Sequence, residues 1–266
     1  MDVTERKVIA VEAIVVAAVV ATALLLQLLV GSFPVEVFAF PLNVIILALW
    51  VFVAYMLHTN REKFMKVYNV YETFYIMATF AIYTLMAVFL MPLIEIYTGG
   101  INDANYKNAY LLILFVIMNL LANGKLPSNH VLEFSGSFRD TRSHAIWEMT
   151  INIVVSVVAI LKWGICGAIV GTIVALLYRG SVMIYYANKK VLGRSVMKTY
   201  KIWLVNGIVF LGVMAVLFVD SFSGLSFGAL LVKGLIYAPL IAIVYIVANF
   251  IFCPKVFLGL KGNKRI

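Results

Sequence analysis

Long apolar runs, separated by short polar segments, dominate the chain. A helix needs about 20 largely apolar residues to cross the hydrocarbon core of a membrane, and several runs reach that length. The pattern predicts an all-α fold, a polytopic membrane helix bundle with about eight transmembrane helices. The expected spans are Val8–Val30, Phe40–Leu57, Val70–Ile94, Ala109–Lys125, Ala145–Leu161, a sixth span that ends near Ala187, Ile202–Val219 and Phe227–Phe252.

One polar stretch, Asn123–Asn152, interrupts the apolar pattern without simply ending it. It contains Pro127, two glycines and the charged residues Arg139, Asp140 and Arg142. These residues predict a helix break and a basic connector between two spans. The segment KWGICG, which follows the fifth span, predicts a tight turn.

The composition agrees with a membrane protein. Hydrophobic residues make up 64% of the chain and charged residues 12%, whereas a soluble domain has roughly 25% charged residues. No loop approaches the roughly 50 residues that a folded soluble domain needs. The net charge of +9 is concentrated in short connectors, which favours membrane topology and attraction to anionic lipid over binding of nucleic acid. We therefore expect membrane lipid, and no nucleic acid, as a partner.

The placement of the basic residues predicts the orientation of the spans. The N-terminus, three alternate connectors and the C-terminal tail are rich in Lys and Arg, whereas the opposite loops contain only Lys107 and Lys162. Under the positive-inside rule, this imbalance places both termini in the cytoplasm. The first apolar run is interpreted as a retained span and not as a signal peptide, because no small-residue cleavage pattern follows it.

Several motifs, in the same order along the chain, carry a resemblance to a known family. They are Tyr71-Glu72 with the polar-aromatic helix that follows, MPLIEIYTGGINDANY, KLPSNHVLEFSGSFRDTRSHAIWEMTINIVVSVV, WGICGAIVGTIVALLYRGSVMIYYANKKVLGRS and KTYKIWLVNGIVF. From about Arg61 to Cys253 the chain resembles the C-terminal part of bacterial polysaccharide flippases. These are lipid-linked oligosaccharide translocases of the multidrug and oligosaccharidyl-lipid exporter superfamily. The resemblance implies a location in the bacterial inner membrane and a polyprenyl-diphosphate-linked oligosaccharide as ligand.

The chain also departs from the family pattern. Family members are about twice as long and have two lobes related by pseudo-symmetry, as alternating access requires, whereas this chain resembles only their last six spans. Residues 61–266 are thus a flippase-like six-helix membrane region with a basic tail, and residues 1–60 are two N-terminal transmembrane helices of unclear origin.

Two functions are consistent with this interpretation. The first is flipping of a lipid-linked oligosaccharide precursor across the bacterial membrane, by a partial or half-length transporter. The second is a non-transporting membrane subunit, or an inactive fusion or fragment, associated with polysaccharide assembly. A complementary membrane subunit or a second copy would supply the missing lobe. We expect no enzyme, because the chain contains no clustered acid and base residues and no nucleotide-binding loop.

Three basic residues within spans are candidates for substrate binding, because intramembrane charges usually face a cavity or a partner. Arg179 either faces a cavity, where it would bind a pyrophosphate, or extends to the headgroups near its helix end. Lys233 has the same alternatives near the outer side. Lys125 adjoins Pro127, where unwound backbone can line a cavity.

Polar residues also recur at helical spacing. Glu148, Asn152 and Ser156 fall on one face of the fifth span. They form either a cavity lining, with Asn152 and Ser156 as substrate ligands and Glu148 as the ion-coupling site, or interhelical hydrogen bonds, with Glu148 paired to a connector arginine. Glu72, which begins a similar stripe on the third span, is expected to be solvated at the interface.

The glycines of the sixth span and the two cysteines indicate helix packing and no metal chemistry. Gly167 and Gly171 form a GxxxG pattern that is typical of close helix packing. Cys166 and Cys253 belong to no CxxC or Cys/His cluster, so no metal site and no cofactor is expected.

Overall fold

The computed structural model describes residues 57, 59–98, 108–217 and 226–254. The chain divides into two units, Met1–Met56 and Leu57–Ile266, and the described residues all belong to the second unit. The predicted spans Val8–Val30 and Phe40–Leu57 lie outside the described residues, apart from Leu57 itself.

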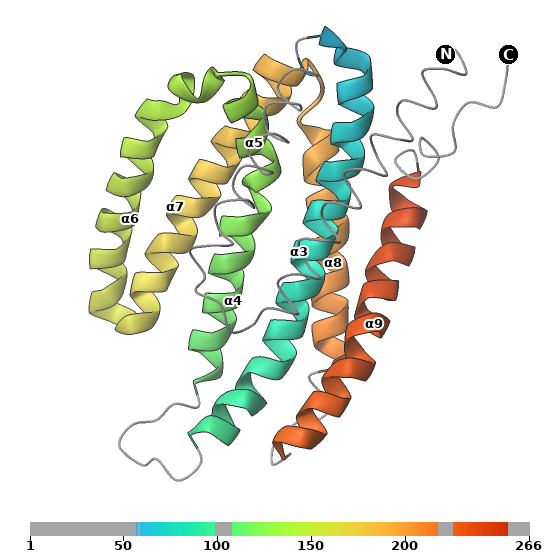
Figure 1. Ribbon diagram of the computed structural model, residues 1–266. Helices are drawn as coiled ribbons and strands as arrows, with labels where there is room; N and C mark the ends of the chain where they lie inside the picture. Colours follow the sequence, from blue (N-terminus) through green and yellow to red (C-terminus); the bar gives the residue numbers. More distant parts are fainter. Residues whose placement is uncertain (1–56, 58, 99–107, 218–225, 255–266) are drawn as a thin grey trace, which may run out of the picture. The chain divides into compact units, whose positions relative to one another are not determined.

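The described residues form helices, and no strand occurs among them. The elements are α3 Arg61–Tyr97, α4 Ala109–Gly124, α5 Leu126–Phe134, the 3-10 helix η1 Ser137–Thr141, α6 Arg142–Trp163, α7 Ile165–Tyr186, the π-helix η2 Ala187–Leu192, α8 Met197–Leu217 and α9 Phe227–Phe252. Six helical segments in this part of the chain are long and apolar enough to cross a membrane, with α4 and α5 counted as one and η1 and η2 joined to α6 and α7. Figure 1 shows them running side by side.

Polar side chains cap several of these helices. The Asn60 side chain accepts a hydrogen bond from the backbone N–H of Lys63 at 3.1 Å, and Asn108 does the same for Leu111 at 3.1 Å. Such a cap satisfies one of the backbone donors that a helix start leaves unpaired. Because of the cap at Asn60, α3 begins nine residues before the predicted span start at Val70.

The predicted helix break is present: α4 ends at Gly124, Lys125 forms a turn, and a separate helix, α5, begins at Leu126. Lys125 itself keeps a right-handed helical conformation, with φ −77° and ψ −14°, and α5 begins at the next residue. Pro127 stands in the first turn of α5, where a helix does not need the N–H that proline lacks. A second break follows at Ser135–Gly136, where Gly136 adopts φ +69°. Counted together with α5, the fourth span extends to Phe134, beyond the predicted end at Lys125, and the irregular backbone beside Lys125 is limited to this one turn residue.

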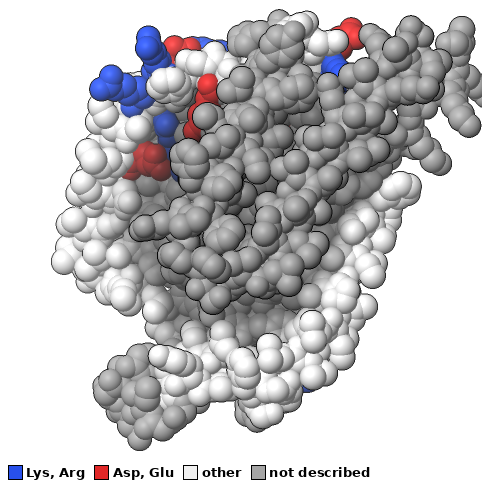
Figure 2. All heavy atoms as spheres, viewed as in Figure 1, with Lys and Arg blue, Asp and Glu red and all other residues white. Residues whose placement is uncertain are grey.

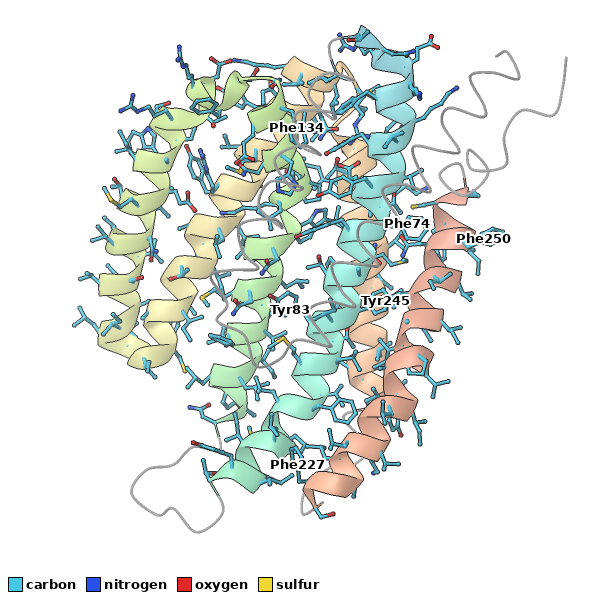
Figure 3. All side chains as sticks on the ribbon, in the orientation of Figure 1. Phe74, Tyr83, Phe134, Phe227, Tyr245 and Phe250 are labelled. Atoms are coloured by element: carbon cyan, nitrogen blue, oxygen red, sulfur yellow. The ribbon has the colours of Figure 1, made fainter. Side chains whose placement is uncertain are left out.

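Helix α3 lies at the centre of the packing, in contact with α4, α8 and α9, while α7 lies between α4 and α6. An apolar core joins the α3 side of the bundle through Ile76, Phe80, Leu120, Ile202 and Ile241, among others. The hydroxyl of Tyr245 on α9 lies 2.7 Å from Thr84 Oγ1 on α3; Figure 3 labels Tyr245 in this region.

The α6–α7 hairpin confirms two predictions. Gly164, with φ +55°, alone separates the two helices and forms the predicted tight turn. Glycines 167 and 171 allow close packing: a Cβ at Gly167 would lie 2.3 Å from the Ala159 backbone, and one at Gly171 would lie 2.1 Å from Ser156 Oγ. Helix α6 packs mainly on α7, and Ala159 is its one buried residue.

Candidate functional site

The basic connectors meet at one end of the described bundle. Arg61 at the start of α3 donates a hydrogen bond to the Val191 carbonyl of η2 at 2.9 Å, and Lys190 lies 3.8 Å from Asp140 of η1. Figure 2 shows charged side chains gathered at the end where α6 begins, while the side of the bundle formed by α6 and α7 is otherwise uncharged. The structure thus joins the connectors that the charge pattern assigned to one side. We call this the basic end.

Three predicted site residues form one ion cluster near the basic end. Glu148 of α6 lies 3.5 Å from Lys125 Nζ through Oε1 and 3.5 Å from Arg179 Nε through Oε2. The side chains of Lys125 and Arg179 are only 17% and 11% exposed, and that of Glu148 is 27% exposed. One carboxylate therefore balances two cations from different helices, which leaves the cluster with a net positive charge. The predicted pairing of Glu148 with a connector arginine is wrong, because its arginine partner is Arg179 within α7.

Arg179 also joins α7 to η1. Its Nη1 donates a 2.7 Å hydrogen bond to the carbonyl oxygen of Thr141, the last residue of η1. A backbone carbonyl at the end of a short helix needs a donor, and the guanidinium supplies one. The guanidinium of Arg179 is thus held by the Thr141 carbonyl and by the Glu148 carboxylate.

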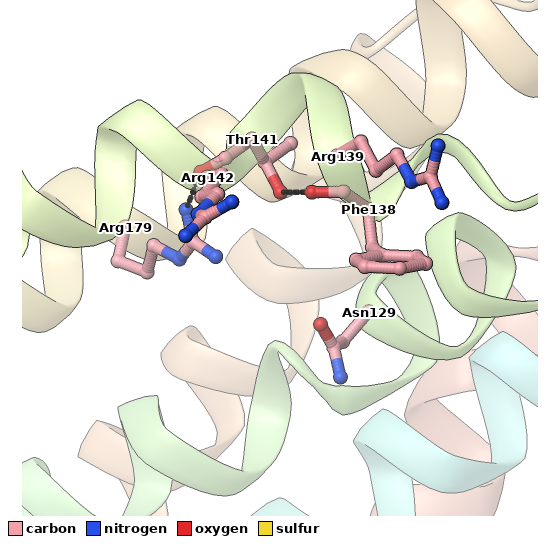
Figure 4. Close-up of a pocket in the computed structure, with 6 residues that line it drawn as sticks. All are labelled: Asn129, Phe138, Arg139, Thr141, Arg142 and Arg179. Carbon is pink, nitrogen blue, oxygen red and sulfur yellow. Dashed lines mark hydrogen bonds between the residues drawn. The ribbon is translucent and has the colours of Figure 1, made fainter.

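An open pocket lies beside Arg179. Its volume is about 800 Å³, and the described residues that line it are Asn129, Phe138, Arg139, Thr141, Arg142 and Arg179. Figure 4 shows that these side chains come from α5, η1, the start of α6 and α7. Arg139 and Arg142 are exposed, and neither forms an ion pair with another described residue. Three guanidinium groups around one pocket favour an anionic ligand, because guanidinium donors match phosphate oxygens in geometry and charge.

Asn152 and Ser156, which were candidates for substrate binding, lie between α6 and α7 and not in this pocket. Ser156 Oγ is 3.0 Å from Asn152 Oδ1 and 3.2 Å from the Ala168 carbonyl oxygen, while Thr172 Oγ1 is 3.4 Å from Asn152 Oδ1. These contacts match the second of the two alternatives, in which the stripe joins neighbouring helices.

Lys233 lies away from the ion cluster. It is within the first two turns of α9, a helix that packs on α3 and α8. Phe227 begins that helix at the end of the bundle opposite to Phe134 (Figure 3). The structure therefore brings Lys125, Glu148 and Arg179 together and leaves Lys233 apart from them.

A second charged cluster was missed by the sequence analysis. Glu72 is 1% exposed, so the expectation that it is solvated is wrong. Its carboxylate lies 2.5 Å from Arg194 Nη2 and accepts a 2.7 Å hydrogen bond from Thr199, while Arg194 Nε donates to Asn188 Oδ1 at 2.6 Å. Arg194 also donates to Asn69. The sequence did contain a signal for this cluster, because a carboxylate within a membrane helix is costly and needs a partner. The sequence does not say which residue is that partner, since this depends on packing.

Aromatic residues add contacts near the pocket. His144 of α6 lies 2.7 Å from the Tyr178 hydroxyl and 3.4 Å from the Tyr186 hydroxyl, both on α7. These bonds strengthen the α6–α7 pair one turn from the pocket arginines. Among the described residues, no group of His, Cys, Asp and Glu could hold a metal ion.

The six long apolar helical segments have the length and composition of transmembrane helices, so the described region is part of a multi-pass helical membrane protein. Comparisons with protein families, with curated proteins and with solved structures found no match.

Proposed function

We propose that the protein moves a polyprenyl-diphosphate-linked oligosaccharide across the bacterial inner membrane, as a partial or half-length flippase with both termini in the cytoplasm. The observation that carries the proposal is the pocket at the basic end, where Arg139, Arg142 and Arg179 surround a volume of about 800 Å³. A diphosphate suits such a set, because forked guanidinium donors match phosphate oxygens in geometry and charge. The ordered motifs that resemble flippases support the same ligand.

The ion cluster gives this pocket a defined anchor. Because Glu148 and the Thr141 carbonyl hold Arg179, that side chain is pre-positioned. Arg139 and Arg142 are exposed and form no ion pair with another described residue. Glu148 is the proposed ion-coupling residue, since its protonation would release two cations at once. Transport of this kind needs no nucleotide, because an ion gradient can drive alternating access, and we propose no enzymatic step.

The test is export of a labelled polyprenyl-diphosphate oligosaccharide in a flippase-deficient bacterial strain that expresses this chain alone. The informative variant is the double substitution R139A/R142A, because Arg179→Ala would also remove the bond to Thr141. A matched control is K189A/K198A, which removes two exposed basic side chains at the same end but outside the pocket. Surface glycan restored by the parent and the control, and lost in R139A/R142A, supports the proposal. Equal export by all three would refute it.

The alternative is a non-transporting membrane subunit that binds a partner or a second copy. The observation that favours it is the sparse packing of α6, in which Ala159 is the one buried residue. Failure of export by a stably inserted chain, even with a co-expressed complementary lobe, would favour this alternative.

A further inference from the structure

The dimensions of α6 place the pocket at a definite depth in a membrane. Arg142 begins the helix and Lys162 lies next to its last residue, Trp163. Twenty residues separate the two cations, about 30 Å along a helix, and the hydrocarbon core of a bilayer is also about 30 Å thick. Between them the only charged side chain is Glu148. The two cations therefore fit the two headgroup layers.

The surface of α6 supports the same placement. Trp147 and Trp163 are 58% and 59% exposed, one near each end of the helix, and exposed apolar side chains such as Ile153, Val157 and Leu161 lie between them. Tryptophans at both ends of an apolar surface are typical of a helix that faces lipid, because indole rings prefer the two membrane interfaces. The exposed face of α6 is therefore suited to contact with acyl chains.

The pocket lies at the headgroup end of this surface. Arg142, one of its walls, is the first residue of α6, and Arg139 precedes it by less than one turn in η1. Phe138, also in the wall, is 55% exposed and offers an apolar contact beside the arginines. Near the pocket, Glu148 pairs with Lys125 and Arg179, and Asp140 pairs with Lys190. The Glu133 carboxylate accepts a 2.6 Å hydrogen bond from Asn129 of the pocket wall.

We infer that this pocket is a lateral binding site for lipid phosphate, reached from the surrounding leaflet along α6. It binds the phosphate group and not the rest of the headgroup, so anionic phospholipids of the bulk membrane occupy it when no lipid-linked oligosaccharide is present. The shared chemistry is a phosphate with apolar chains attached, and a free phosphate in water is not the natural ligand. The inference rests on the pocket assigned under the proposed function, but it requires binding alone and no transport.

The test uses the purified full chain in nanodiscs that contain phosphatidylcholine with a small fraction of a fluorescent phosphatidylglycerol, and measures energy transfer from the chain's tryptophans. We expect saturable transfer that unlabelled phosphatidylglycerol displaces. R139A/R142A should lower the affinity for phosphatidylglycerol by about tenfold or more, since each basic residue at an anionic surface contributes about 1 kcal/mol. The control K189A/K198A should change this affinity little.

Two further arms separate the sources of phosphate. Inorganic pyrophosphate in the buffer should displace the lipid probe only weakly. Strong displacement at micromolar concentration would identify a site for a soluble anion and overturn the inference. Equal loss of probe binding in R139A/R142A and K189A/K198A would also overturn it, because attraction would then come from general charge. Export with no specific lipid binding would refute this inference alone, whereas binding without export would refute only the transport proposal.

Discussion

Arg194 Nη2 lies 2.5 Å from Glu72 Oε2, and both side chains are almost fully buried, at 5% and 1% exposure. The pair joins the first third of α3 to the connector between η2 and α8, 122 residues along the chain. Thr199, Asn188 and Asn69 satisfy the remaining polar atoms around it. A buried charge without its partner is strongly unfavourable, so removal of either side chain alone should destabilise the fold.

Arg194→Met should destabilise the protein by about 3–5 kcal/mol, because Glu72 would then be buried without a cation. Thermal unfolding in detergent, followed by size-exclusion fluorescence, measures the change. The double variant Glu72→Met with Arg194→Met should recover much of the loss, since no charge stays buried. Glu62→Gln, on the exposed first turn of α3, serves as the control. An unchanged melting temperature in Arg194→Met would contradict the arrangement described.

Gly171→Ala should destabilise the α6–α7 hairpin, because its new Cβ would lie 2.1 Å from Ser156 Oγ and 2.6 Å from the Ser156 backbone nitrogen. Overpacking of this kind costs about 1–3 kcal/mol. Gly180→Ala is a matched control on the same helix, since the nearest atom to its Cβ would be Lys125 Cβ at 3.9 Å. The same thermal assay compares the two, and similar melting temperatures for both variants would argue against the close helix contact.

Glu148→Gln should have a small effect on stability, about 1 kcal/mol or less, because the carboxylate is partly solvated and its ion pairs are 3.5 Å long. Its effect should depend on Lys125. In a double-mutant cycle with Lys125→Met, the two losses should not add, since both substitutions break the same contact. Strict additivity in thermal unfolding would show that the pair makes no net contribution.

The charge pattern predicts that Lys189 and Lys162 lie on opposite sides of the membrane. In a background with Cys166 and Cys253 replaced by serine, a membrane-impermeant maleimide should label Lys162→Cys in intact cells. Labelling of Lys189→Cys should require permeabilised cells, because the positive-inside rule predicts that the basic connectors face the cytoplasm. The reverse pattern would invert the proposed orientation.

The sequence by itself determined the membrane class, the spans of the described region to within a few turns, the turn at Gly164 and the close contact at Gly167 and Gly171. These features are local, because the length of an apolar run, the helical period and the conformational freedom of glycine all act within a few residues. The helical periodicity also placed Glu148, Asn152 and Ser156 on one face of α6.

Only the tertiary structure decided what those polar residues contact. Glu148 could have met a connector arginine or a cavity, and the packing of α4, α6 and α7 gave it Lys125 and Arg179. Glu72 was expected in solvent, yet the connector after η2 folds over α3 and buries it against Arg194. Ion-pair partners depend on which helices pack together, and helices with similar apolar surfaces leave that choice open in the sequence. The pocket arginines come from three separate elements, so their grouping too is a property of the fold.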